Sequence, residues 1–118
     1  MHIDGAQRTA RRVSVLTDVI KCRRPIAESR MLLDAFGWDS DPLVAVTPED
    51  VSAVLRDFVA GVVTVGFVEE WAETLECRDD VDAVDQITAG AIFALANPVL
   101  EGELDIPAAR RLIALLSP

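Results

Sequence analysis

The sequence contains no tyrosine and a single histidine, His2, which directly follows the first methionine. A serine or cysteine nucleophile normally needs a positioned base, most often histidine, so we expect no nucleophilic catalysis. Zinc and di-iron sites are not expected either, because Cys22 and Cys77 have no neighbouring ligands. The six glycines are scattered singly, which leaves no glycine-rich loop for a phosphate. We therefore predict a protein that is not an enzyme and that holds no cofactor and no metal.

Long apolar runs and an excess of basic residues are also absent. No stretch approaches the ~18 uncharged apolar residues of a membrane-spanning helix. Arginines rather than a long apolar segment follow Asp4, so we expect no secretory signal, and we interpret the two cysteines as free thiols in a reducing cytoplasm. Eleven Lys and Arg against twenty Asp and Glu give a net charge of −9. Such a surface repels nucleic acid, which is therefore not the expected partner.

What the sequence does contain is typical of one globular domain. The chain has 118 residues, of which 51% are hydrophobic and 26% are charged. This length matches a single domain, and the mixture is not that of a disordered chain. We found no internal repeat, no low-complexity tract and no flexible linker. The sequence therefore predicts one domain over residues 1–118.

Apolar residues recur at helical spacing along most of the chain. The clearest case is Val51, Val54, Leu55, Phe58 and Val59, which follow one another at i, i+3, i+4, i+7 and i+8 behind a threonine cap and a proline. We predict an all-α fold, a compact bundle of about five to six short helices. The expected helices are Asp4–Cys22, Pro25–Phe36, Pro48–Ala60, Val65–Glu76 capped by Thr64, Val81–Ala96, and Ile106–Leu116 capped by Asp105.

Three local expectations complete this picture. The apolar segment Leu43–Val46 is interpreted as a connector that is too short to indicate a sheet. Asp79 and Asp80 stand at the position of a cap for the fifth helix. The second half of that helix, Ala89–Ala96, is apolar on every side, which is typical of a central helix, so we expect it in the core of the bundle.

The charges are distributed unevenly along the chain. Residues 1–38 hold seven basic and four acidic side chains, whereas residues 39–118 hold four basic and sixteen acidic ones. One interpretation is a charged surface for solubility, with attraction between the two halves. The other is an acidic surface that recruits a basic partner.

The acidic side chains are densest between Glu69 and Asp85, and Arg78 is the only basic residue in this stretch. They are interpreted as a solvated helix face or as a protein-binding face. Glutamates at i, i+3 and i+4 repel one another by a few tenths of a kcal/mol per pair, which a cationic partner would relieve. A calcium loop is disfavoured, because the sixth position counted from Asp80 is Asp85 and not glycine.

Two tryptophans are the aromatic anchors of the chain. Trp71 lies on the apolar side of its helix and is expected in the core. Trp38 stands in the loop Trp38–Asp41, where it either locks the loop onto the bundle or contributes to an interface. Asp39 and Asp41 are typical turn formers that bond their own backbone.

Three short segments carry a resemblance to a known group of proteins. They are Trp38–Asp41 (WDSD), Trp71–Asp80 (WAETLECRDD) and Leu95–Pro98 (LANP). The chain resembles, over roughly residues 30–116, a group of small bacterial helical proteins that share these motifs. In that group a glycine is expected where this chain has Cys77, so the resemblance implies either a different helix end or a strained turn here. In size, acidity and helical content the group is similar to immunity proteins of bacterial toxin systems, which implies binding and blocking of a cationic toxin.

The sequence therefore predicts a small acidic binding protein that occludes a basic protein partner. The alternative is a structural or regulatory homo-oligomer, in which the basic first helix of one copy meets the acidic helices of another. Both depend on carboxylates that face solvent without cationic partners; arginines of the first forty residues lying across them would remove the reason for a docking role. The residues expected to contact the partner are Glu69, Glu70, Glu73, Glu76, Asp79, Asp80, Trp38, Asp39 and Asp41.

Overall fold

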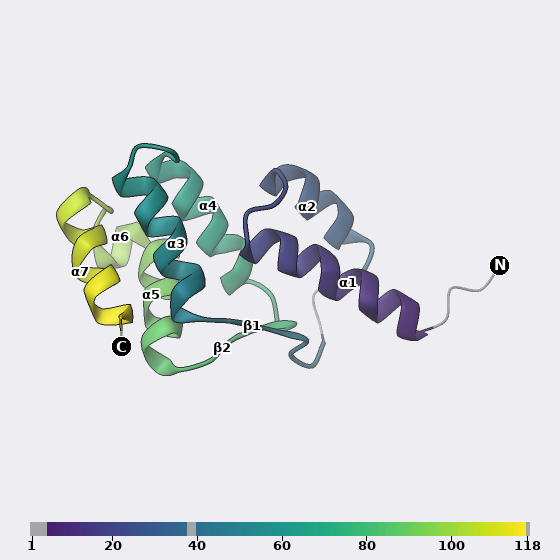
Figure 1. Ribbon diagram of the computed structural model, residues 1–118. Helices are drawn as coiled ribbons and strands as arrows, with labels where there is room; N and C mark the ends of the chain where they lie inside the picture. The colour runs from purple at the N-terminus through teal and green to yellow at the C-terminus, as the bar shows by residue number, and fades with distance from the viewer. Residues whose placement is uncertain (1–4, 38–39, 118) are drawn as a thin grey trace.

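The computed structural model describes residues 5–37 and 40–117, and within these ranges the fold is all-α, as predicted. Over these described residues the chain runs through seven helices and one pair of very short strands (Figure 1). In chain order the elements are α1 (Gly5–Ile20), α2 (Ile26–Asp34), β1 (Val44–Val46), α3 (Pro48–Val59), α4 (Val65–Glu76), β2 (Val81–Ala83), α5 (Gln86–Ala96), α6 (Pro98–Glu101) and α7 (Ile106–Leu116).

The starts of α3, α4 and α7 are set by side-chain caps at the positions where the sequence indicated them. Thr47 accepts a hydrogen bond from the amide of Asp50, whose carboxylate accepts one from the Thr47 amide, so α3 begins with a complete capping box. Thr64 and Asp105 cap α4 and α7 with a single side-chain hydrogen bond each, accepted from the amides of Phe67 and Ala108. Each cap satisfies an amide that the first turn of the helix leaves without a partner.

The region after α4 differs from the prediction. Val81–Ala83 is a strand and not the first turn of a helix, and it pairs in parallel with Val44–Val46, the segment interpreted above as a connector. The cap of α5 is Asp85 rather than Asp79 or Asp80. The Asp85 carboxylate accepts a hydrogen bond from the amide of Thr88 at 2.7 Å. Pairing with a distant segment therefore overrides the local preference of these residues for a helix start.

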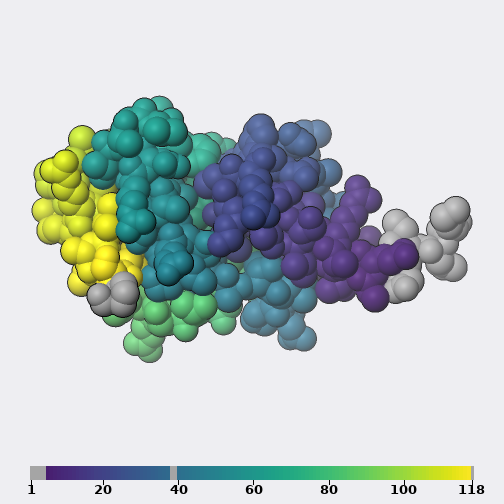
Figure 2. Space-filling view, in the orientation of Figure 1, coloured from purple at the N-terminus to yellow at the C-terminus, as the bar shows by residue number. Residues whose placement is uncertain are grey.

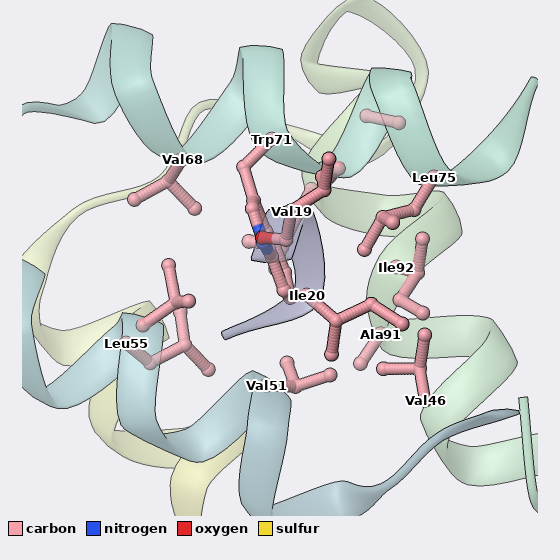
Figure 3. Packing of buried hydrophobic residues seen from close by; sticks show 14 of the residues in the cluster. Val19, Ile20, Val46, Val51, Leu55, Val68, Trp71, Leu75, Ala91 and Ile92 are labelled. Carbon is pink, nitrogen blue, oxygen red and sulfur yellow. The ribbon is translucent and has the colours of Figure 1, made fainter. Parts of the chain in front are cut away.

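The core lies between α4 and the helices around it. Trp71 of α4 is fully buried, and its indole Nε1 donates to the carbonyl of Val19 in α1 at 3.0 Å. Figure 3 shows its side chain reaching into the cluster beside Val19 and Ile20. The expectation of a core role for Trp71 is thus confirmed.

The expectation that Ala89–Ala96 lies in the core holds for one side of this segment only. One face of α5 packs against α4, with Ala91, Ile92 and Leu95 buried, whereas Phe93 is 42% exposed and Ile87 is 57% exposed. The outward side is otherwise built from Ala89 and Gly90, whose small size leaves little apolar surface to hide. An apolar composition on every side therefore does not require burial on every side.

The arrangement of helices is elongated. The α1–α2 pair forms one end of the molecule and α7 the other, with α3, α4 and α5 between them (Figures 1 and 2). Helix α7 packs mainly on α3, and α5 mainly on α4. The acidic segment predicted as a binding face therefore lies between the two ends of the molecule, on α4 and the residues that follow it.

Candidate functional site

The structure divides the predicted binding residues into buried, partly exposed and exposed ones. Glu73, Glu76 and Asp79 are exposed, Glu69 and Glu70 are partly exposed, and Asp80 is fully buried. Asp41 is exposed and its carbonyl accepts the Ser40 hydroxyl at 2.8 Å. Trp38 and Asp39 lie outside the described residues. Most of the acidic stretch therefore lies at the surface, whereas Asp80 lies in the interior.

Asp80 is the centre of a buried ion-pair cluster. Its carboxylate accepts two hydrogen bonds from Arg78 and one from Arg12, with donor–acceptor distances of 2.8–2.9 Å. Arg78 also donates to the carbonyl of Gly37 at 2.7 Å, and the Asp80 carbonyl accepts the amides of Leu43 and Val44. This cluster ties α1, the loop after α2, β1 and the end of α4 together, so Asp80 is not available to a partner.

The charges of this cluster do not cancel. Burial by itself raises the pKa of Asp80, but the hydrogen bonds from Arg78 and Arg12 outweigh it and hold the pKa below its usual value. One carboxylate thus faces two guanidinium groups. The Nη2 atom of Arg12 is buried without a hydrogen-bond partner among the described residues, and the Arg12 guanidinium lies over the Phe36 ring, 5.9 Å from its centroid.

A second arginine from the first forty residues reaches the acidic stretch. Arg30 of α2 donates to the Thr74 hydroxyl at 2.9 Å, and its Nη1 lies 3.7 Å from a carboxylate oxygen of Glu70. Both charged side chains of this pair are about half exposed, so the pair contributes little to stability. Two of the predicted binding carboxylates, Asp80 and Glu70, therefore already have intramolecular arginine partners.

Three glutamates of α4 have no such arginine partner among the described residues. Glu69, Glu73 and Glu76 follow one another at i, i+4 and i+7, and none of them has a Lys or Arg of the described residues within ion-pair distance. We call these three residues the acidic ridge. Asp79, in the loop after the helix, is likewise exposed and has no ion pair in the described part of the chain. The acidic ridge and Asp79 are the remaining candidates for a cationic partner.

A cavity lies on each side of the acidic ridge. The α2 cavity, of about 520 Å³, is lined by parts of α2, the end of α4 and the end of α5, and it includes Glu73 and Glu76. The α7 cavity, of about 440 Å³, lies between α4, α5, α6 and α7, and it includes Glu69. The ridge therefore borders two hollows in the range of volumes that protein clefts use for binding.

The far end of the ridge is positioned by the segment LANP. The side-chain amide of Asn97 donates to the Glu76 carboxylate at 3.0 Å and to the Phe93 carbonyl at 2.8 Å. Asn97 follows α5, and Pro98 begins the short helix α6, which was not predicted from the sequence. Two of the three motifs noted in the sequence thus meet through Glu76 and Asn97.

Both cysteines are free thiols on the surface. Cys77 ends α4 with φ −76°, so the helix ends without a strained turn and without the left-handed residue expected from the resemblance. The strained cysteine is instead Cys22, with φ +56°. Although the residue is exposed as a whole, partial burial of its sulfur, followed by the charges of Asp57 and Asp50, raises the pKa of Cys22 to about 11, so it is a weak nucleophile.

Among residues 5–37 and 40–117, no three His, Cys, Asp or Glu side chains form a group that could hold a metal ion. Over the same ranges, every helix is too short or too polar to cross a membrane. Comparison of the chain with family models, curated protein sequences and solved structures found no match. The resemblance drawn from the three sequence motifs therefore stays a prediction.

Proposed function

We propose that this protein is a small acidic binding protein that blocks a basic protein partner by covering it, in the manner of an immunity protein. The observation that carries the proposal is the acidic ridge, in which Glu69, Glu73 and Glu76 lie on one helix without an ion-pair partner in the described part of the chain. No residue of the protein is proposed to be catalytic.

The distribution of arginines supports this proposal. Two guanidinium groups, those of Arg12 and Arg78, converge on the single carboxylate of Asp80. The acidic ridge, by contrast, has i, i+4 and i, i+3 carboxylate pairs that repel each other by a few tenths of a kcal/mol per pair. Arg12 and Arg78 thus hold the fold together, while the repulsion along the acidic ridge has no compensating cation among the described residues. A cationic partner would remove the repulsion on binding.

The same charge has a kinetic consequence. With a net charge of −9, the protein attracts a basic partner over a distance of about one Debye length, ~8–10 Å at ordinary salt. Complementary charge raises association rates above the ~10⁵–10⁶ M⁻¹s⁻¹ of neutral surfaces, and added salt lowers them again. Apolar contacts in the α7 cavity, which Val68, Leu95 and Leu112 line, then slow dissociation, because buried apolar contacts near the centre of an interface carry most of the binding energy.

A charge-reversal experiment tests the proposal. The partner is first isolated by affinity capture and cross-linking from the source cells, and its association rate is then measured by stopped flow at low and high salt. The double variant Glu69→Lys, Glu73→Lys is expected to associate at least tenfold more slowly at low salt. The matched control is the double variant Glu49→Lys, Asp57→Lys, since Glu49 and Asp57 are exposed acids of α3 outside the ridge. Equal rates for the two double variants would contradict the proposal.

A homo-oligomer remains the second candidate, because the described part of α1 presents exposed basic side chains. Arg11 is exposed and has no ion pair among the described residues, and Arg8 is exposed beside the Phe36 ring. In this alternative, α1 of one copy would lie along the acidic ridge of the next. Sedimentation velocity at several salt concentrations separates the two candidates: a dimer that dissociates as salt rises favours the homo-oligomer, and a monomer throughout favours the binding protein.

The proposed compartment is the cytoplasm. Cys22 and Cys77 are both free, exposed residues, and free thiols persist in a reducing environment. Mass spectrometry of the protein purified from its source under alkylating conditions tests this point, with two alkylated cysteines as the expected result.

A further inference from the structure

The α7 cavity has an apolar floor that no segment of the described chain fills. Val68 of α4 and Leu95 of α5 are buried beneath it, and Leu104 and Leu112 close it from the side of α7. Its volume is about 440 Å³, which lies within the range of ligand-binding clefts. An apolar hollow of this kind loses contacts when it is empty and gains them when an apolar group enters.

An exposed apolar side chain also stands at the edge of this cavity. Leu115 lines the cavity and is 64% exposed, and Leu104 and Leu112, which line it too, are only partly buried. The lining of the cavity therefore includes apolar side chains that remain in contact with solvent.

The charge around the cavity determines which partner it fits. Four carboxylates line it, those of Glu69, Glu101, Glu103 and Asp105, against one cation, Arg111. None of the four has an ion pair within the described residues, although Asp105 also accepts the Ala108 amide as a helix cap. An acidic or neutral partner would gain nothing from this edge, whereas lysine or arginine side chains would pair with it.

We propose that the α7 cavity receives an apolar side chain of the basic partner, and that lysines or arginines next to it in the partner pair with Glu69 and Glu103. This inference rests on the proposed function, since it names the part of the partner that the acidic ridge would bring into place. Glu69 belongs both to the ridge and to the cavity, so the ridge leads directly to the apolar hollow. The cavity then supplies the central apolar anchor, and the carboxylates supply the polar edge.

Short peptides of defined sequence test the inference without the natural partner. The probe is Ac-Lys-Lys-Phe-Lys-Lys-NH2, titrated into ¹⁵N-labelled protein while the amide cross-peaks are followed by NMR. The two control peptides replace the central Phe by Ser, or all four Lys by Glu. We expect the largest shifts at residues that line the α7 cavity, at least fivefold weaker binding of the Ser peptide, and no saturable binding of the Glu peptide.

Two pairs of variants separate the cavity from the rest of the surface. Leu115→Ser is expected to weaken the Phe peptide at least threefold, whereas Met31→Ser, a change at an equally exposed apolar residue of α2, leaves it unchanged. Glu103→Lys is expected to weaken the Phe peptide at least threefold, whereas Glu49→Lys leaves it unchanged. All four sites are exposed, so the variants are expected to fold.

The outcomes distinguish failure of the cavity from failure of the proposed function. If the Phe and Ser peptides bind equally well and shift residues of the acidic ridge, the inference is overturned while a basic partner is still supported. If the Glu peptide binds as tightly as the Lys peptide, both are overturned. Concentration-dependent shifts at the cavity without any peptide would show that a second copy of the chain is its occupant, which also overturns the inference.

Discussion

The Nε atom of Arg12 lies 2.8 Å from a carboxylate oxygen of Asp80, although 68 positions separate the two residues in the chain. Asp80 is fully buried and Arg12 is 12% exposed, so this is an interior ion pair rather than a surface one. Arg78 completes the cluster from the other side of the carboxylate. One of the nine residues expected to face a partner is therefore a structural residue that joins α1 to the segment between α4 and β2.

Loss of the Asp80 carboxylate is expected to destabilise the protein strongly. Asp80→Asn leaves two guanidinium groups buried without their counter-charge, and breaking a buried pair in this way costs about 3–5 kcal/mol. Equilibrium unfolding in urea measures the change. Arg12→Met is the milder companion variant, since Asp80 keeps both hydrogen bonds from Arg78; we expect a loss of about 1–3 kcal/mol.

The adjacent aspartate provides the control for this series. Asp79 is exposed and has no ion pair among the described residues, so Asp79→Asn is expected to change the free energy of unfolding by less than about 0.5 kcal/mol. A similar loss in Asp79→Asn and Asp80→Asn would show that the buried cluster is not the source of the effect.

The cluster also predicts how stability depends on pH. The pKa of Asp80 is lowered in the folded state, so the unfolded chain takes up a proton on this group at a higher pH than the folded protein does. The stability that the charged form contributes is fully present above the unfolded pKa, about 3.9, and is lost as the pH falls through the lower folded pKa. Urea midpoints measured from pH 6 to pH 2.5 are expected to fall below about pH 4.

A second carboxylate contributes to the same acid dependence. Burial raises the pKa of Asp50, but the hydrogen bonds from Lys21 and from Thr47 outweigh it and lower the pKa below its usual value. Asp80→Asn is therefore expected to show a shallower acid dependence than the unaltered protein, with the contribution of Asp50 still present. An identical pH profile in both proteins would exclude Asp80 as a source of the acid sensitivity.

Cys22 occupies a position that favours glycine. The amide of Arg23 donates to the Asp18 carbonyl and that of Cys22 to the Val19 carbonyl, the two bonds of a left-handed helix end. Cys22 adopts φ +56° there, which a residue with a side chain does at a cost. Cys22→Gly is expected to stabilise the protein by about 0.5–1 kcal/mol in thermal or urea unfolding.

The other cysteine is the matched control for this substitution. Cys77 also ends a helix, but its φ of −76° is accessible to every residue. Cys77→Gly therefore brings no relief of strain and is expected to be neutral or to destabilise by up to about 1 kcal/mol. Stabilisation by both substitutions would mean that removal of a thiol, and not the backbone conformation, is responsible.

The thiol of Cys22 is expected to react slowly with disulfide reagents. Its pKa is raised to about 11, so at pH 8 roughly 0.1% is thiolate, against roughly a quarter for an unperturbed cysteine of pKa about 8.5. The higher intrinsic nucleophilicity of a basic thiolate recovers only part of this difference. In the variant Cys77→Ser, we expect Cys22 to react roughly 10- to 30-fold more slowly than the cysteine of a short unstructured peptide with blocked ends. Equal rates at pH 8 would contradict the raised pKa.

Two neighbouring residues of α5 test how this helix is oriented. Ile92 is 6% exposed and Phe93 is 42% exposed. Ile92→Ala is expected to cost about 2–4 kcal/mol in urea unfolding, because it opens a cavity in the core, whereas Phe93→Ala is expected to cost less than about 1.5 kcal/mol, because much of its ring already contacts water. A larger loss of stability in Phe93→Ala than in Ile92→Ala would show that Phe93, and not Ile92, faces the core.

Local signals explain why most helices could be predicted from the sequence. Thr47, Thr64 and Asp105 are caps that act on amides three residues away, and the apolar periodicity behind each of them is complete within one helix. Such features depend on nothing outside their own segment. The bounds of α7, Ile106–Leu116, match the predicted range for this reason.

The remaining features depend on segments that are distant in the chain. The hydrogen-bonded pairing of Val44–Val46 with Val81–Ala83 has no signal in either segment alone, and each is only three residues long. Asp80 resembles a helix cap in sequence, and nothing near it indicates that Arg12 will reach it. The α7 cavity was likewise missed, because it forms between four helices and none of them encodes it alone. The acidic ridge was visible in the sequence because it lies on a single helix.

The parallel pairing of β1 with β2 constrains the order in which the protein can assemble. Parallel strands cannot be joined by a tight turn, and here the connection consists of α3 and α4. On the ribosome, α1 emerges long before Asp80, so Arg12 cannot pair with Asp80 until α2, α3 and α4 have been synthesised. A nascent chain arrested before β2 would therefore expose its first two helices to proteases, and protection would begin only when residues 80–83 have left the exit tunnel.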